Sequence, residues 1–299
     1  MAFRNIFVSS PSYLYIDKNR LCIKQEFDQT KFDIEDINSL VLESRDSTIS
    51  VYTLSQLAQY QVCVFVCNAR HSPSGVLLPF CSHSRHLKAL KSQINMTQEF
   101  KDSLWQAIIK NKLQNQAKVL QLFSKDKADY IFDLSNKVQP GDQTHTEANA
   151  ASVYFEQLFG VGFARHQDNF INAALDYGYA ILRGLISRTI VAYGYEPCIG
   201  IWHKSELNAF NLADDMIEPF RPFVDQFVFS MVERHQDFDV QAKRQLFAIV
   251  DSSVTVDEKK YNLNNAIDKV IIGLNQSIVN STVILPHVKL TPIERFKFL

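Results

Sequence analysis

The sequence has few cysteines and no long apolar run, and both shortages exclude classes of protein. The five cysteines among 299 residues are odd in number and irregularly spaced, so we predict buried thiols rather than disulfides or a zinc site. These residues are Cys22, Cys63, Cys67, Cys81 and Cys198. No apolar stretch reaches the roughly 20 residues of a membrane span, and the N-terminus lacks a secretion signal. We therefore expect a cytoplasmic protein with no membrane association.

The sequence also lacks a large net charge that would by itself identify a partner. Its formal net charge is −1, which does not favour nucleic-acid binding by the chain as a whole. Residues 76–146, however, contain ten Lys and Arg against six Asp and Glu, a local net charge of +4. Such a basic segment is a candidate phosphate-binding surface. A solvated helix surface remains an equally good interpretation of any single lysine in it.

Residues 1–75 show the pattern of a β domain. Short apolar or alternating runs follow one another at roughly ten-residue spacing, which is typical of a small β-sandwich or related sheet. Residues 17–20, between two such runs, predict a hairpin. Cys63 and Cys67 lie in one apolar run at an even separation, which places both on the same face of a strand. Residues 76–84 contain turn-forming residues and are predicted to be a linker.

Beyond the linker, the hydrophobic period becomes helical. In one helix, Ile109, Leu113 and Leu120 share a face, whereas Lys112 lies off it with other lysines. We predict an α+β fold, with a small β-sandwich-like domain at 1–75, a linker at 76–84 and a larger all-α catalytic domain at 85–299. The expected helices span residues 85–96, 99–123, 147–158, 169–193, 204–218, 222–235, 239–250 and 264–278.

Two isolated polar residues are candidate metal ligands. Thr146 is a candidate N-cap that would place Glu147 in the first turn of a helix, followed by small residues. Taken alone, Glu147 is better explained as a charge favoured at a helix N-terminus. His203 directly follows an apolar run, where a hydrogen-bonded core histidine is the commoner explanation. Neither residue identifies a site by itself.

An acidic cluster supplies the remaining candidates. Asp215 and Glu218 are spaced i and i+3, so they share a helix face, and Pro219 then breaks the helix. Two carboxylates and one imidazole suit Mn²⁺ or Mg²⁺ with positions left for water and phosphate. Such an ion favours phosphodiester chemistry. Spacing alone does not connect Glu147 to the other candidates.

Five stretches together resemble a known family. They are TEANAA at 146–151, FAR at 163–165, INAALDYGYAILR at 171–183, GIWH at 200–203 and NLADDMIEPFRP at 211–222. In this order they resemble the CRISPR-associated adaptation integrases, metal-dependent DNA nucleases/integrases that insert new spacers. The closest likeness is to the branch found with type II single-effector systems. The resemblance covers essentially the whole chain, because the family also has a small N-terminal β domain and a helical catalytic domain.

The resemblance implies the chemistry of the site. It implies metal ligands at Glu147, His203 and Glu218, with Asp215 as an adjacent acidic catalytic residue and Mg²⁺ or Mn²⁺ as the cofactor. It implies transesterification, in which the 3′-hydroxyl of a prespacer attacks a phosphodiester of the CRISPR repeat. A non-catalytic architectural DNA-binding subunit and a generic metal-dependent nuclease remain as alternative functions.

The resemblance also implies DNA contacts and partners. Arg165, Tyr177 and Lys204 match positions that line the DNA end and the active site, and Arg85 matches a position that contacts duplex DNA. The implied partners are double-stranded DNA, a second copy of the chain in a homodimer formed through the N-terminal domains, and a small ferredoxin-like adaptation protein. Two homodimers and a dimer of that protein would form a heterohexamer.

Overall fold

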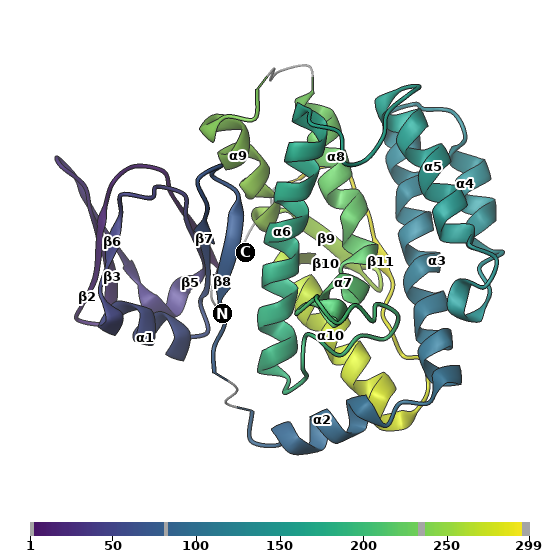
Figure 1. Ribbon diagram of the computed structural model, residues 1–299, viewed down its shortest axis with the longest axis horizontal. Helices are drawn as coiled ribbons and strands as arrows, with labels where there is room; N and C mark the ends of the chain where they lie inside the picture. Colours follow the sequence, from purple (N-terminus) through teal and green to yellow (C-terminus); the bar gives the residue numbers. More distant parts are fainter. Residues whose placement is uncertain (1–2, 81–82, 233–236, 295–299) are drawn as a thin grey trace. The chain divides into compact units, whose positions relative to one another are not determined.

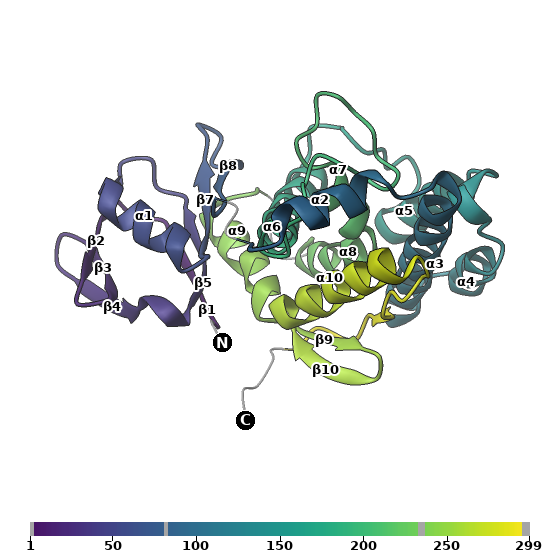
Figure 2. The same ribbon diagram turned by 90° about the horizontal axis from the view of Figure 1, so that it is seen from below.

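The computed structural model describes residues 3–80, 83–232 and 237–294, which form two compact units, Met1–Ser84 and Arg85–Leu299 (Figures 1 and 2). Cys81 and the last residues of the helix expected at 222–235 lie outside the described residues. Within the described ranges, no helix combines the length and apolar character needed to cross a membrane.

The first unit contains two four-stranded sheets. One has the order β1-β5-β7-β8, and its first three strands run parallel. The other has the order β4-β3-β2-β6. The strands are β1 (Arg4–Val8), β2 (Tyr13–Asp17), β3 (Arg20–Lys24), β4 (Gln29–Asp33), β5 (Ile37–Leu42), β6 (Thr48–Ile49), β7 (Cys63–Cys67) and β8 (Pro73–Leu77), with helix α1 at Val51–Gln59.

Local sequence explains this unit well. The predicted hairpin joins β2 to β3, and Lys18 and Asn19 adopt φ angles of 48° and 62°, as a two-residue hairpin turn requires. Residues of both sheets, including Leu14 of one and Leu40 of the other, share one hydrophobic core. Cys63 and Cys67 are both buried on β7, as their spacing predicts, whereas Cys198 in the second unit is exposed, contrary to the expectation of buried thiols.

The second unit is mainly helical and is organised around α3. Figure 1 shows α3 beside α4 and α5, and α3 also contacts α7 and α8. Helix α4 occupies a segment in which the sequence predicts none, and the helix expected at 204–218 begins only at residue 211. The helices are α2 (His86–Ile94), α3 (Gln98–Leu122), α4 (Ala128–Ser135), α5 (Thr146–Phe159), α6 (Phe170–Ala192), α7 (Asn211–Met216), α8 (Arg221–Met231), α9 (Val240–Phe247) and α10 (Leu263–Asn280).

The second unit is not all-α, because it also contains a three-stranded sheet of order β10-β9-β11. Its strands are β9 (Ser253–Val256), β10 (Lys259–Asn262) and β11 (Val288–Lys289). The sequence does not predict this sheet, since strands of two to four residues are too short to display a reliable alternation.

Strand β11 is fastened to α3 by two asparagines. Asn111 exchanges two hydrogen bonds with the backbone of Val288, at 2.7 and 3.0 Å. Asn115 donates to the carbonyl of Val288 and accepts from the N–H of Leu290. It also donates to the carbonyl of Pro219 at 2.9 Å. Asn115 therefore joins the strand to the turn that follows Glu218.

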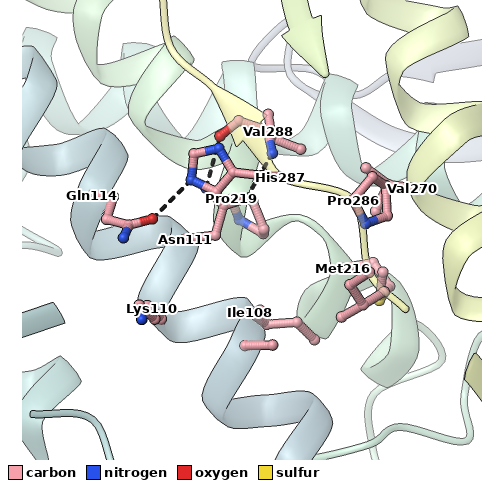
Figure 3. Close-up of a pocket in the computed structure, with 12 residues that line it drawn as sticks. Ile108, Lys110, Asn111, Gln114, Met216, Pro219, Val270, Pro286, His287 and Val288 are labelled. Atoms are coloured by element: carbon pink, nitrogen blue, oxygen red, sulfur yellow. Dashed lines mark hydrogen bonds between the residues drawn. The ribbon is translucent and has the colours of Figure 1, made fainter. Parts of the chain in front are cut away.

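A cavity of about 360 Å³ lies between α3, α10 and the segment before β11 (Figure 3). Figure 3 shows the imidazole of His287 pointing toward Gln114, and the two side chains are hydrogen-bonded at 2.8 Å. Met216 and Pro219 also line this cavity, so it adjoins the turn after α7.

Candidate active site and metal centre

Three charged side chains from separate elements meet in the second unit. The ammonium of Lys112, on α3, lies 2.5 Å from Oε1 of Glu147, on α5. The same nitrogen lies 2.6 Å from Oε2 of Glu218, in a short turn (η3, Glu218–Phe220) after α7. Lys112 is only 6% exposed. Its prediction as one of the lysines off the buried face is therefore wrong. We call these three residues the carboxylate–lysine cluster.

Glu147 is placed by a cap that the sequence does not reveal. Thr146 is predicted to be the N-cap of its helix, but it is the first residue of α5. The two oxygens of Asp142 accept hydrogen bonds from the N–H groups of Thr146 and Glu147, at 2.9 and 3.0 Å. The capping carboxylate is thus supplied by the preceding turn, in which Asp142 has a φ angle of 45°. This cap directs Glu147 from the first turn of α5 toward Lys112.

His203 is held by Asp215. Nδ1 of the imidazole lies 2.7 Å from Oδ1 of Asp215, within hydrogen-bond distance. Asp215 is fully buried and also accepts the backbone N–H groups of Ile201, Trp202 and His203. Because an ionised carboxylate only accepts, Nδ1 of the neutral imidazole carries the proton and Nε2 keeps its lone pair. Asp215 therefore orients His203 and does not belong to the carboxylate–lysine cluster itself.

Two further residues fix the position of His203. Trp105 of α3 stacks on Trp202 at 5.4 Å and meets the imidazole of His203 edge-on at 5.7 Å. Gly200 allows the loop to close around Asp215, since a Cβ there would lie 2.3 Å from the carbonyl oxygen of His203. Any other residue at position 200 would force this loop apart.

Glu218 is anchored on its second side by an arginine. Nε of Arg221 donates to Oε1 of Glu218 at 2.8 Å, and its guanidinium lies over the ring of Tyr179 at 4.6 Å. The hydroxyl groups of Tyr179 and Tyr154 both bond to the buried carboxylate of Asp225. Pro219 ends α7 and turns the chain into η3, as its position predicts. Together these contacts fix Glu218 against α6 and α8.

The electrostatics of the cluster favour the charged forms of Glu218 and Lys112. Burial alone would raise the pKa of Glu218, but Arg221 and Lys112 outweigh burial and lower this pKa to about 2. Burial also disfavours a charge on Lys112, yet Glu218 and Glu147 raise the pKa of this lysine above its usual value. The hydrogen bond to Asp215 is the main reason why the pKa of His203 is raised above the ordinary value of 6.5. The site thus holds two carboxylates, an ammonium and a titrating imidazole.

The predicted DNA-contacting residues are dispersed around this site. Arg165 donates to Asn172 and to Asp176, and its guanidinium lies 5.6 Å from the ring centroid of Tyr179. Because Arg221 contacts the same ring, Arg165 lies close to the site. Tyr177, in contrast, is buried and packs edge-on against Phe238.

The other two predicted DNA contacts are exposed. Lys204 directly follows His203. Arg85 precedes α2, which packs against α10 and is attached through Gln93 to the segment before His203. Both positions allow contact with a large ligand, and their DNA contacts stay predictions.

The donor set suits a hard metal ion. Within residues 3–80, 83–232 and 237–294, no three His, Cys, Asp or Glu side chains are arranged as a complete metal site. Glu147 and Glu218 nonetheless share one cation, the ammonium of Lys112. Oε2 of Glu218 is buried and receives no well-directed hydrogen bond. Glu147, Glu218 and Nε2 of His203 offer donor atoms of the types that bind Mg²⁺ or Mn²⁺, and their assignment as metal ligands stays a prediction.

Comparison with known proteins identifies the family. Residues 6–250 match the model of the family described as CRISPR associated protein Cas1. This chain belongs to the Cas1 family. It is 34% identical over 284 residues to the CRISPR-associated endonuclease Cas1 of Neisseria meningitidis serogroup C (strain 8013), covering 94% of this chain and 93% of that protein.

Solved structures share the Cas1 fold at low sequence identity. A casposase bound to integration product superposes with a TM-score of 0.78 at 17% identity, covering 95% of this chain and 92% of that one. A Cas1 protein from Thermotoga maritima gives 0.76 at 17% identity, covering 94% and 99%. A Cas6-RT-Cas1–Cas2 complex gives 0.70 at 16% identity, covering 94% of this chain and 35% of that one. The predicted α+β fold and Cas1-type resemblance are thereby confirmed.

The sequence does not identify Lys112 and Arg221 as parts of the site. Lys112 and Arg221 are the cations that neutralise the carboxylates, but lysine and arginine give no ligand signal of their own. Arg221 does lie three residues after Glu218, so an i,i+3 ion pair could have been predicted. For Lys112, its place near the middle of a helix rich in buried residues is the only available signal.

Proposed function

We propose that this Cas1-family chain is a metal-dependent DNA endonuclease/integrase that inserts prespacer DNA into a CRISPR array. The observation that carries the proposal is the meeting of Glu147 and Glu218 at one shared cation. They come from elements separated by 71 positions in sequence and are held in place by Asp142 and Arg221. Family membership and the casposase-like fold support the same chemistry.

In this proposal, Glu147, His203 and Glu218 hold Mg²⁺ or Mn²⁺. When bound, such an ion polarises a phosphodiester and activates the attacking hydroxyl. Asp215 keeps the proton on Nδ1 of His203, so that Nε2 is available as a ligand. Arg165, beside the ring shared with Arg221, would neutralise charge on the scissile phosphate. His203 is then a ligand and not a general base, since its lone pair is committed.

The proposed partners follow from the family and from the complexes formed by its structural neighbours. The chain would bind double-stranded prespacer and repeat DNA, with Arg85, Arg165, Tyr177 and Lys204 as the proposed contact residues. It would form a homodimer through its N-terminal unit and assemble with a small ferredoxin-like protein into a heterohexamer. A Cas1–Cas2 assembly is named for one structural neighbour, which supports such a partner. We assign the protein to the cytoplasm and to the type II branch.

A strand-transfer assay tests the function directly. Purified protein is mixed with a fluorescent oligonucleotide bearing a 3′-OH and a supercoiled plasmid that carries the repeat, with Mn²⁺, Mg²⁺ or EDTA. We expect joined product with either metal and none with EDTA, because the ion would polarise the scissile phosphodiester of the plasmid and activate the 3′-hydroxyl of the oligonucleotide. An oligonucleotide ending in a 3′-deoxynucleotide is the control and should not be joined.

The same assay separates the alternative functions. Plasmid nicking that depends on Mn²⁺ but yields no joined product would favour a metal-dependent nuclease without integration. DNA binding without nicking or joining, with the adaptation partner present, would favour an architectural subunit. Joining in the presence of EDTA would contradict the proposed metal dependence.

Replacing Asp215 should weaken metal binding and change its pH dependence. The Asp215→Asn variant removes the carboxylate that orients His203, so we expect a Mn²⁺ affinity lower by about 10–100-fold. Metal binding requires a deprotonated imidazole. Because the pKa of His203 is raised, acidification protonates this imidazole at a pH above 6.5 in the wild type, and the affinity for Mn²⁺ falls from that pH downward. In the variant this fall should move to lower pH.

Calorimetric titration of Mn²⁺ between pH 5.5 and 8 measures both effects. The matched control is Asp214→Asn. Asp214 bonds to Arg183 and Asn208 rather than to His203 and raises the pKa of His203 less than Asp215 does, so the pH midpoint should move less in this variant. An unchanged pH midpoint in Asp215→Asn would show that this carboxylate does not control the imidazole.

A further inference from the structure

The buried lysine of the carboxylate–lysine cluster has no role in the chemistry described so far. Lys112 lies on α3 among apolar residues, including Ile108 and Ile109, and two carboxylates contact its nitrogen within 2.6 Å. A buried ammonium is costly unless it is paired, and here both partners are candidate metal ligands. Its placement therefore bears on how a metal would bind.

The ammonium and a metal ion compete for the same carboxylate oxygens. Oε1 of Glu147 and Oε2 of Glu218 both contact Lys112, while Arg221 contacts Oε1 of Glu218. Two unpaired carboxylates this close would repel each other, so a cation between them stabilises their approach. A divalent ion bound by the same two oxygens would meet the positive charge of Lys112 at contact distance. The two cations cannot hold this position together.

We propose that Lys112 is a positioning residue whose ammonium acts as a built-in counter-cation: it holds Glu147 and Glu218 together until a divalent ion displaces it. This inference rests on the proposed metal-dependent function. It predicts that Lys112 stabilises the protein without metal and at the same time weakens metal binding. A lysine with a purely structural role would do only the first.

Opposite effects of one substitution test the proposal. Lys112→Met removes the charge and keeps an unbranched side chain of similar length. In protein stripped with a chelator, we expect a lower Tm than in the wild type, because the carboxylates lose their shared partner. The Kd for Mn²⁺, measured by the electron paramagnetic resonance signal of free Mn²⁺, should fall by about tenfold or more. Saturating Mn²⁺ should raise the Tm of this variant by more than it raises the Tm of the wild type.

Two further variants control the comparison. Lys112→Arg keeps the charge, so its Mn²⁺ affinity should stay at or below that of the wild type, and its Tm should stay near the wild-type value. Lys118→Met removes an exposed lysine from the same helix and should change neither quantity. If Lys112→Met fails to fold, a higher Mn²⁺ affinity in Lys112→Arg would still contradict the proposal.

The outcomes separate this inference from the proposed function. If the wild type binds Mn²⁺, Glu147→Gln weakens that binding, and Lys112→Met binds no tighter than the wild type, the displacement model is wrong and the metal site stands. If the wild type binds no Mn²⁺ at all, both the metal site and the displacement model are wrong. Tighter Mn²⁺ binding together with a lower Tm in Lys112→Met supports both.

Discussion

Glu147→Gln should reduce strand transfer by at least ~10³-fold while leaving the fold intact. The substitution removes one of the two carboxylates that share the cation of the carboxylate–lysine cluster. Losing an anionic metal ligand removes several kcal/mol of transition-state stabilisation, and about 4 kcal/mol corresponds to three factors of ten in rate. Glutamine retains the length of the side chain, and the Asp142 cap contacts only the backbone of residue 147.

The measurement is the rate of joining in the plasmid assay with saturating Mn²⁺, accompanied by thermal unfolding of the variant. Glu156→Gln is the matched control, because Glu156 is an exposed residue of the same helix. Its rate should equal that of the wild type. If Glu147→Gln joined DNA at the wild-type rate, Glu147 would not be a metal ligand. This conclusion would hold whether or not Glu218 is one.

Asn115→Leu should strongly destabilise the second unit. It leaves the buried carbonyl of Pro219 and the N–H of Leu290 without their partner. Each unsatisfied buried group costs about 1–3 kcal/mol, so we expect a loss of ~3 kcal/mol. For a unit of the size of Arg85–Leu299, such a loss lowers Tm by roughly 6–12 °C. Because Pro219 directly follows Glu218, Mn²⁺ affinity should fall as well.

Asn111→Leu separates the two effects of that substitution. Among the described residues, the side chain of Asn111 bonds to Val288 in β11, whereas Asn115, one helical turn away, contacts Pro219. Both variants should therefore lower Tm, measured by circular dichroism, but only Asn115→Leu should also weaken Mn²⁺ binding. Equal Mn²⁺ affinities in the two variants would show that the bond to Pro219 does not position Glu218.

Much of the fold could be predicted because it depends on local patterns. The hairpin at Lys18 and Asn19, the buried face of β7 and the long helices α3 and α6 follow from spacing and turn chemistry. Helix α4 and the sheet of β9, β10 and β11 could not be predicted. Helix α4 has only eight residues and the strands have two to four, too few for a clear period, and packing against α3 and α10 stabilises them.

Of the residues at the candidate site, only the carboxylates and the histidine could be predicted from the sequence. Asp215 and Glu218 share one segment, so their spacing is informative, and the family resemblance adds Glu147 and His203. The cap from Asp142 requires a left-handed backbone at that residue, for which the sequence gives no clear signal. The burial of Lys112 depends on carboxylates 35 and 106 positions away, and no local pattern encodes contacts at such separations.

The attachment of β11 to α3 also has a consequence for biosynthesis. Asn111 and Asn115 emerge from the ribosome early, yet their partners Val288 and Leu290 are translated about 175 residues later. Helices that fold during translation therefore form before β11 is available. Only when β11 has been made can the amide of Asn115 bond both to Pro219 and to Leu290. A chain released after α10 would form a nearly complete helical unit in which the turn after Glu218 lacks the support of β11. Metal acquisition would then be among the last steps of maturation.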